Sequence, residues 1–492
     1  MEVAPKIEPN AANAAAEQPR SWRIDLFAKF PWLERFVRLR AFQFLVILPN
    51  LALFYVFLLA GIFGSPVGNR NIIIVFVWIL WWFLLIAVMV PFGSRVWCTV
   101  CPLPFFGEWA QRRALINVRT GCSPGTRNQL FGLLKRWPRK LSNIWLQNFG
   151  FLFLATFSAM LVTRPIVSVL VLGGMILLAA VMALIWRHRT FCNYVCPISG
   201  FLSLYAMTST VELRSADKDV CRKCRAKACT AGSPRGWACP WFLYMGKLDR
   251  NNYCGLCMEC VKTCPHDNVR LYLRPFCSDT TIKGYDEVWK AFIMLVLAMG
   301  YSVVLLGPWG TTKDWANVTE VGQWAGFAVY ALVLWFAALV GFPAIYYLAI
   351  RAGRWLANRI STGQTDSAPS LKHLFIRYAY TLVPLGLLAW IAFSVPLLAV
   401  NGSYIISVLS DPMGRGWDLF GTAHFPWTPL HPEWVPYLQI PLLLAGLYYA
   451  LRSGHKIALE LWDDDRQAAR SMIPLTILLT GVTIGFMRMF VG

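Results

Sequence analysis

The chain has 492 residues, of which 57% are hydrophobic and only 14% are charged, and its formal net charge is +21. Soluble globular domains carry about 25% charged residues, so this composition excludes an ordinary soluble protein and indicates a membrane protein. In a soluble protein such a charge would suggest nucleic-acid binding, but basic residues also gather in the cytoplasmic loops of multi-pass membrane proteins. We therefore expect a membrane as a partner and no nucleic acid.

The first 20 residues, MEVAPKIEPNAANAAAEQPR, lack the basic start and apolar core of a signal peptide, so we expect a disordered tail there. Several arginine and lysine residues follow, up to residue 40. We interpret residues 1–40 as a cytoplasmic tail that ends in a basic juxtamembrane segment.

The rest of the chain contains repeated apolar stretches of the length that a membrane span needs, which is about 20 residues. The candidate spans are residues 42–62, 71–91, 144–163, 166–186, 288–308, 323–349, 374–400, 435–451 and 472–490. Nine spans would put the two termini on opposite sides of the membrane.

The distribution of lysine and arginine orients these spans. The segment before the first span and the loop 94–143 are rich in basic residues, whereas the four loops on the other side contain one each. Those four residues are Arg70, Arg164, Lys313 and Arg415. Because basic loops stay in the cytoplasm, we expect a protein of the bacterial cytoplasmic (inner) membrane with a cytoplasmic N-terminus and a periplasmic C-terminus.

Two cysteine pairs, each followed by proline, come directly after the second and fourth spans. The first hook is VWCTVCPLP, with Cys98 and Cys101, and the second hook is TFCNYVCPISG, with Cys192 and Cys196. Both preceding spans run inward, so both hooks emerge on the cytoplasmic face. Together they supply the four thiolates of a [4Fe-4S] cluster, so we predict a cluster at this "hook site". Redox-active or structural thiols are the alternative.

The stretch PFFGEWAQRRALINV after the first hook predicts an amphipathic helix at the membrane interface. It carries Glu108, with Arg112 four residues later, and this spacing favours an ion pair on one helix face. The alternative is that Glu108 accepts a proton in quinol chemistry, which makes it a candidate quinone-site residue.

Eight further cysteines lie in a segment with ferredoxin-type spacing. The stretch NNYCGLCMECVKTCPHDNVR (251–270) contains C-x2-C-x2-C-x3-C followed by proline, a pattern in which three cysteines hold one cubane and the fourth ligates a second cluster. The alternative, a zinc site, would not require this spacing. Two-cluster ferredoxins are pseudo-twofold symmetric, and the fourth cysteine of each motif ligates the other cluster. On this pattern we assign Cys221, Cys224, Cys229 and Cys264 to "site 1" and Cys254, Cys257, Cys260 and Cys239 to "site 2". We predict two [4Fe-4S] clusters here.

Other cofactors have no signature in this chain. No C-x-x-C-H motif for covalent haem occurs, none of the six histidines lies in the middle of a candidate span, and no glycine-rich dinucleotide motif occurs. We therefore expect neither haem nor flavin. Cys122 and Cys277 are isolated, and no role is assigned to them.

These features predict an all-α polytopic membrane protein of about nine transmembrane helices, with an inserted α+β ferredoxin-like two-cluster segment on the cytoplasmic face. After the tail, residues 41–204 form four spans with the two hooks, and residues 205–285 form the ferredoxin-like segment. Residues 286–492 add five spans, with an outer loop at 401–436 that is rich in tryptophan and proline.

Two spans with a hook, two more with another hook and then a two-cluster ferredoxin segment resemble the membrane-bound polyferredoxins of the NosR/NapH type. These are related to the FixG/CcoG-type [4Fe-4S] membrane proteins. The resemblance covers roughly residues 40–310 and leaves an additional C-terminal transmembrane region. It implies an inner-membrane protein that moves electrons between the quinone pool and a partner. This chain differs in its first hook, which is one residue shorter than the family's usual hook.

We therefore expect a membrane-bound iron–sulfur protein that links the quinone pool to a redox partner in a respiratory or related electron-transport chain. If it is an enzyme, it is an oxidoreductase subunit of the quinol dehydrogenase type. Quinone or quinol is the expected substrate, and the expected partners are other subunits, a cytochrome or a periplasmic redox protein. The alternative is a membrane metal or thiol reductase that acts in the assembly of another metalloenzyme.

Overall fold

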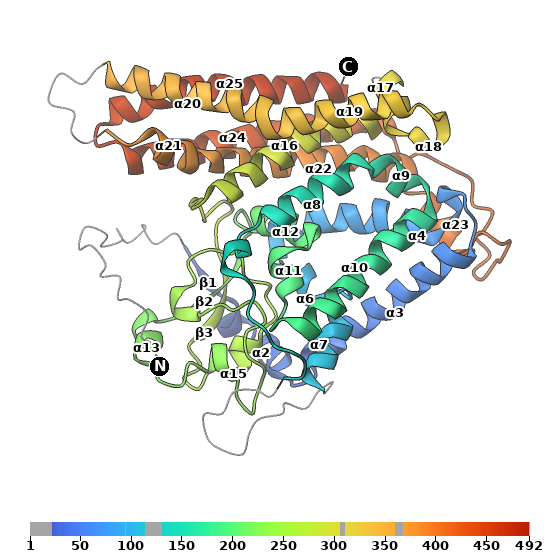
Figure 1. The fold of residues 1–492 in the computed structure, drawn as a ribbon, viewed down its shortest axis with the longest axis horizontal. Helices are drawn as coiled ribbons and strands as arrows, with labels where there is room; N and C mark the ends of the chain where they lie inside the picture. Colours follow the sequence, from blue (N-terminus) through green and yellow to red (C-terminus); the bar gives the residue numbers. More distant parts are fainter. Residues whose placement is uncertain (1–21, 94, 114–129, 306–309, 360–367, 492) are drawn as a thin grey trace.

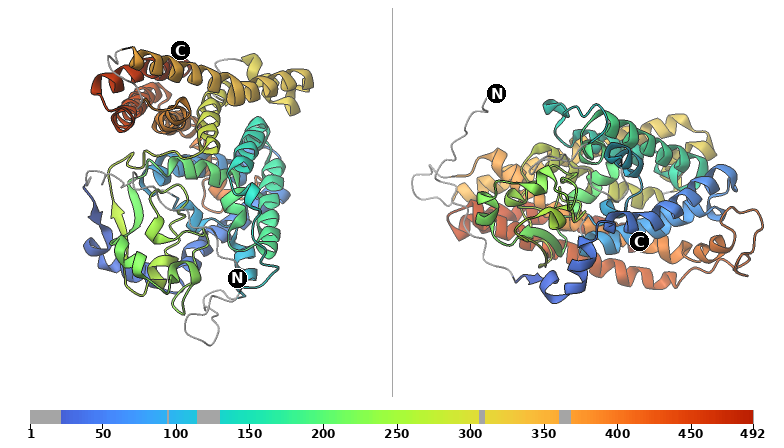
Figure 2. Two further views of the ribbon diagram at one scale, coloured as in Figure 1. Left: turned by 60° about the vertical axis from the view of Figure 1, so that its left-hand side comes forward. Right: turned by 90° about the horizontal axis from the view of Figure 1, so that it is seen from below.

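The computed structural model describes residues 22–93, 95–113, 130–305, 310–359 and 368–491 (Figure 1). The expected disordered tail at 1–20 and Cys122 lie outside these described residues. The described chain is mostly helical with one small sheet, as the sequence predicts. The helices form two layers, and the sheet lies at one end of the first layer (Figures 1 and 2).

The first layer contains the helices of residues 42–185. They are α3 (Phe42–Phe63), the segment 72–93, α8 (Trp145–Thr156), α9 (Ser158–Thr163) and α10 (Pro165–Ile185). The segment 72–93 consists of α4 (Ile72–Ile74), η3 (Val75–Trp81), η4 (Leu84–Met89) and α5 (Val90–Gly93). Both η3 and η4 are π-helical. Because π-helical turns are rare and frequently mark functional sites, this segment is a candidate part of a functional site.

The second layer contains the C-terminal helices. They are α19 (Trp324–Phe336), η7 (Ala337–Gly341), α20 (Phe342–Asn358), α21 (Leu371–Tyr378), η8 (Ala379–Thr381), α22 (Leu382–Asn401), α24 (Val435–Leu461) and α25 (Asp465–Val491). The helix α16 (Tyr285–Leu305) joins the layers, because it packs on α8 in the first layer and on α22 in the second (Figure 2). The indole of Trp390 on α22 donates a 3.0 Å hydrogen bond to the Met294 carbonyl of α16.

Among the described residues, seven helical segments are long and apolar enough to cross a membrane, which is compatible with a multi-pass membrane protein. They are residues 42–63, 72–93, 165–185, 285–305, 324–358, 371–401 and 465–490. The expected span 144–163 is divided at Phe157 into α8 and α9. The expected span 435–451 lies within α24, whose second half carries Arg452 and Lys456. The number of nine spans stays a prediction.

The turns at the helix ends opposite the sheet pack on one another. The Ser65 amide donates a 2.7 Å hydrogen bond to the Met413 carbonyl, and the Ile72 amide donates to the Pro412 carbonyl at 3.1 Å. These contacts join the turn between α3 and α4 to the loop 401–436, which begins with α23 (Tyr404–Ser410). The expected outer loop is therefore packed against the first helical layer.

The sheet has three antiparallel strands in the order β1 (Ile24–Asp25), β3 (Val269–Leu273), β2 (Val211–Ser215). Leu273 pairs with both Ile24 and Val211. The N-terminal segment continues through α1 (Leu26–Lys29) and α2 (Pro31–Arg38), which bury Phe27 and Val37 in the core around the ferredoxin-type cysteines. Part of the expected tail is therefore an ordered component of the ferredoxin-like segment.

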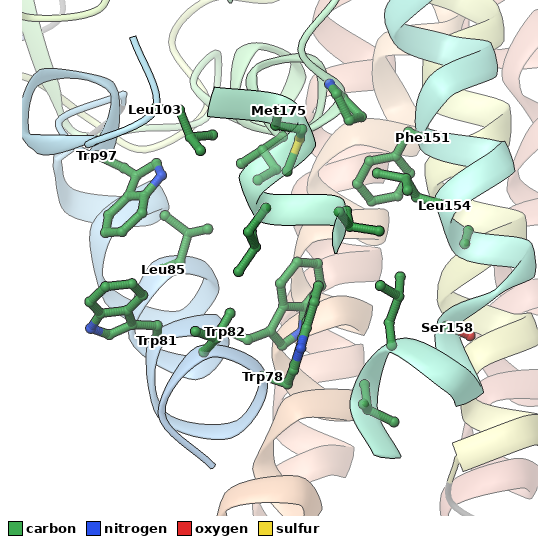
Figure 3. A pocket seen from close by; sticks show the side chains of 18 of the residues that line it. Trp78, Trp81, Trp82, Leu85, Trp97, Leu103, Phe151, Leu154, Ser158 and Met175 are labelled. Atoms are coloured by element: carbon green, nitrogen blue, oxygen red, sulfur yellow. The ribbon is translucent and has the colours of Figure 1, made fainter. Parts of the chain in front are cut away.

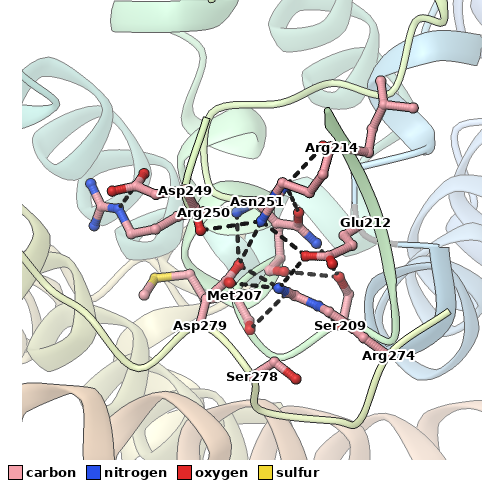
Figure 4. A network of polar contacts seen from close by, with 12 residues as sticks. Met207, Ser209, Glu212, Arg214, Asp249, Arg250, Asn251, Arg274, Ser278 and Asp279 are labelled. Atoms are coloured by element: carbon pink, nitrogen blue, oxygen red, sulfur yellow. Dashed lines mark hydrogen bonds and ion pairs between the residues drawn. The ribbon is translucent and has the colours of Figure 1, made fainter. Parts of the chain in front are cut away.

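A buried network of charges connects this sheet to the loop before Cys254 (Figure 4). Arg274, at the end of β3, contacts Glu212 of β2 at 2.9 Å and both carboxylate oxygens of Asp279, at 2.5 and 2.9 Å. The Asn251 amide donates a 2.8 Å hydrogen bond to Asp279, and the Asn251 side chain accepts from Arg214 at 2.9 Å. This network fixes the cysteine-bearing loop relative to the chain that leads into α16.

Candidate metal centres

The two hooks meet at the ends of the first-layer helices that lie toward the sheet. Cys98 lies on α6 (Trp97–Val100), Cys101 ends that helix, Cys192 lies on α11 (Thr190–Tyr194), and Cys196 caps α12 (Pro197–Tyr205). All four thiols are buried and line one small cavity. The hook site, whose halves are 91 residues apart in the sequence at the nearest cysteines, is therefore assembled by the packing of the spans.

The local chain favours this arrangement of the second hook. Pro197 occupies the first turn of α12, where a missing amide hydrogen costs nothing. The Cys196 sulfur accepts a 3.4 Å hydrogen bond from the Ser199 amide. Burial raises the pKa of the Cys196 thiol to about 12, and the neighbouring Cys98 adds to this rise. A thiolate in this cavity therefore requires a metal or another positive partner.

Buried arginines provide positive charge next to the hook site. Arg95 lies 3.6 Å from the Cys98 sulfur and donates a 2.8 Å hydrogen bond to the Asn252 carbonyl in the loop before Cys254. Its guanidinium carbon lies 4.2 Å from the ring centroid of Trp241. Arg189 donates a 2.7 Å hydrogen bond to the Cys98 carbonyl. Both arginines therefore hold the first hook in place.

Glu108, the candidate quinone-site residue, lies on α7 (Phe105–Arg112) and is buried. It forms the expected ion pair with Arg112 and a second one with Arg189, at 2.6 Å. Burial by itself would raise the pKa of Glu108, but the two arginines lower it below its usual value. Glu108 thus neutralises arginines beside the hook site, and its role as a proton acceptor stays a prediction.

The four cysteines of site 1 line a second small cavity. Asn268 donates from its side chain to the Cys221 sulfur at 3.3 Å and from its amide to the Cys264 sulfur at 3.4 Å. Hydrogen bonds to sulfur are among the factors that set the potential of an iron–sulfur cluster. Sequence reasoning did not single out Asn268, although it follows the cysteine motif directly.

The four cysteines of site 2 interact with one another. Burial raises the pKa of the Cys260 thiol well above its usual value, and Cys257, Cys254 and Cys239 raise it further. On either side of Cys257, the backbones of Leu256 and Met258 adopt left-handed conformations with φ of 51° and 60°. Such conformations are unfavourable for these residue types and cluster at ligand-binding loops.

The three sites follow one another from the helix ends toward the sheet. Thr99 in the first hook donates a 2.6 Å hydrogen bond to the Gly255 carbonyl of site 2. The Cys239 amide of site 2 donates a 2.9 Å hydrogen bond to the Cys229 carbonyl of site 1. Site 2 therefore lies between the hook site and site 1. Cys277 contacts Tyr380 and belongs to none of the three groups.

Within the described ranges, no group of three or more histidine, cysteine, aspartate or glutamate side chains is arranged to hold a single metal ion. A single zinc ion requires thiolate ligands about 2.3 Å from one point. A cubane instead distributes its four ligands over four iron atoms. This absence therefore concerns single metal ions. The cavities at the hook site and at site 1 are each lined by four cysteines, which is the ligand set of a cubane.

An apolar cavity of about 130 Å³ lies among the helices next to the hook site (Figure 3). Trp78, Trp81 and Trp82 of the π-helical segment line one part of it, and α8, α9 and α10 line another. Its lining shares Trp97, Cys101, Leu103 and Ile198 with the cavity of the hook site. The tryptophan run in VWILWWF was the signal in the sequence that could have indicated this cavity.

Two segments of the chain, residues 74–121 and 167–209, match the family model described as a 4Fe-4S binding domain. The first segment contains Cys98 and Cys101, and the second contains Cys192 and Cys196, so each match includes one hook. These matches and the buried cysteines support an iron–sulfur protein of the [4Fe-4S] class. Searches of curated proteins and of solved structures returned no match.

Proposed function

We propose that this iron–sulfur protein is an electron carrier of the bacterial inner membrane that links the quinone pool to a redox partner. The observation that supports the proposal is the gathering of twelve cysteines into three groups of four, one after another from the helix ends to the sheet. The proposed ligands are the four cysteines each of the hook site, site 2 and site 1. With the N-terminus in the cytoplasm, as the basic loops predict, all three sites would face the cytoplasm.

Each site would hold a [4Fe-4S] cluster, which when bound exchanges one electron at a time. The chain's own residues supply the thiolates, exclude water from the hook site, and place Asn268 and Arg95 as donors at the sulfurs. Because neighbouring sites are in contact, an electron would cross only a short distance from one cluster to the next. We expect another subunit, a cytochrome or a periplasmic redox protein as the partner, because the chain carries no further cofactor signature of its own.

The first experiment is iron and sulfide quantitation on anaerobically purified protein, combined with EPR during titration with a quinol. We expect about 12 irons per chain, as three [4Fe-4S] clusters require. We also expect cluster signals that appear when quinol is added. About 8 irons would contradict a cluster at the hook site, and full iron content with clusters that do not respond to quinol would contradict the link to the quinone pool.

The charge of Arg95 is expected to raise the reduction potential of a cluster at the hook site. A unit charge at about 7 Å and an effective dielectric constant of about 20 contributes about 2.4 kcal/mol, or about 100 mV for one electron. Because a reduced cluster is more negative than an oxidised one, Arg95→Met should lower the potential by roughly that amount. Arg95→Lys keeps the charge and serves as the matched control.

The measurement is an EPR-monitored redox titration of both variants at equal iron content. A similar shift in both variants, or a rise in the methionine variant, would show that Arg95 acts through packing on Trp241 and not through its charge.

A further inference from the structure

We propose that the apolar cavity beside Cys101 binds the ring of an isoprenoid quinone. This inference rests on the proposed function and locates its quinone site. The cavity lies between membrane-length helices, so a lipid-soluble ligand can reach it from the bilayer, and it adjoins a proposed cluster ligand.

The lining suits a flat aromatic ring. Four tryptophans, Trp78, Trp81, Trp82 and Trp97, lie along one part of the cavity, and Phe151 lies across from them (Figure 3). Trp78 is held in place because its indole donates a 2.8 Å hydrogen bond to Ser168. Cofactor pockets are mostly apolar and aromatic, with a few polar groups that fix orientation. Planar rings stack favourably on indole faces.

Polar groups are present at two ends of this cavity. At one end Trp97 directly precedes Cys98, and its indole N–H is a donor of the kind that binds a quinone carbonyl. At the other end lies the buried Ser158 (Figure 3), beside the hydroxyl groups of Tyr301 and Tyr330. Ser158 and Tyr301 both line the cavity. Hydroxyl groups can both donate to and accept from a quinone or quinol oxygen.

The cavity also has the position that electron transfer requires. Trp97 and Cys101 line both this cavity and the hook-site cavity, so a ring at the Trp97 end would lie one side chain from a cluster ligand. Glu108 lines two other cavities, one with His188 and one with Gln43, and neither is lined by a hook cysteine in the described part of the chain. The apolar cavity is therefore the best of the three as a quinone site.

The test is photolabelling of the full-length, iron-loaded protein with a short-tailed azidoquinone, followed by peptide mapping. We expect label on residues 72–103 or 145–163 that an excess of unlabelled quinone removes. Ala155→Phe adds a ring inside the cavity and should abolish this label and the reduction of the clusters by quinol. Reduction by dithionite and the iron content should stay unchanged. Leu177→Phe, on an exposed face of α10, is the matched control.

If Ala155→Phe loses iron, Ser158→Ala replaces it as the variant, with an expected five- to tenfold weaker labelling, about the loss of one hydrogen bond. Label elsewhere in a protein that quinol still reduces would overturn the cavity assignment and leave the proposed function intact. Unchanged labelling in Ser158→Ala and Ala155→Phe would also overturn it. Absence of both labelling and quinol reduction in the iron-loaded wild type would instead contradict the quinone link itself.

Discussion

Cys192→Ala is expected to lose about four of about twelve irons per chain and to retain the other two clusters. The reason is that the hook site draws two thiols from each hook, so neither hook can complete a cluster without the other. Sites 1 and 2 draw their cysteines from residues 221–264 and do not depend on Cys192. Iron and sulfide quantitation, with EPR of the dithionite-reduced protein, measures the loss.

The comparison among variants makes this prediction specific. Cys101→Ala should have the same iron content as Cys192→Ala, and the double variant should lose no more, because both residues belong to one site. Cys192→Ala combined with Cys221→Ala should lose about eight irons, because two sites are affected. Cys277→Ala removes a partly buried thiol that belongs to none of the three groups and should keep full iron content. Full iron content in Cys192→Ala would contradict the assignment of the hook site.

The cysteine motifs could be recognised because the short spacing within each one is local, whereas the hook site joins two motifs that are 91 residues apart. The motif around Cys254 fixes three thiols within one loop, and the proline after Cys264 directs the fourth away from it. The pair Glu108–Arg112 was predictable for the same reason, since residues four apart share one helix face. In both cases the information lies within a few residues of the chain.

Interactions between distant segments could not be predicted in this way. Arg189 pairs with Glu108 across 81 residues, and Arg95 reaches Asn252 across 157, and no spacing rule connects such positions. The two residues of β1 are too few to produce a periodic pattern, so the tail gave no sign of joining the sheet. The division of the span 144–163 at Phe157 was also hidden, because hydropathy stays high through the break.

The cavity beside Cys101 depends on the same kind of distant packing. Trp78, Trp81 and Trp82 have the i, i+3, i+4 spacing that places side chains on one helix face, so their common surface was readable from the sequence. The spacing does not show which distant segments pack opposite that face and close the cavity. The largest share of the other lining residues comes from helices between residues 145 and 185, and the remainder come from α3, the π-helical segment, the two hooks, α16 and α22.

Arg274→Met is expected to destabilise the ferredoxin-like segment by about 3 kcal/mol, at the lower end of the cost of removing one partner from a buried ion pair. Only 1% of the Arg274 side chain is exposed, and its partners Glu212 and Asp279 are buried as well (Figure 4). Without Arg274 these carboxylates keep the buried Arg214 as a counter-charge, at 3.2 and 3.5 Å. Glu212 also keeps the half-exposed Arg23, at 3.0 Å. These remaining partners are the reason for expecting the lower end of the range.

The measurement is urea unfolding followed by loss of the visible absorbance of the clusters, compared at equal starting iron content. Lys283→Met is the matched control, because it removes a lysine whose ion pair with Asp249 is more than half exposed, and exposed pairs contribute about 0–1 kcal/mol. Equal midpoints for the two variants would contradict a stabilising role of the buried network. Because Asn251 and Asp279 connect this network to the loop before Cys254, we expect the cluster at site 2 to be lost first in the Arg274 variant.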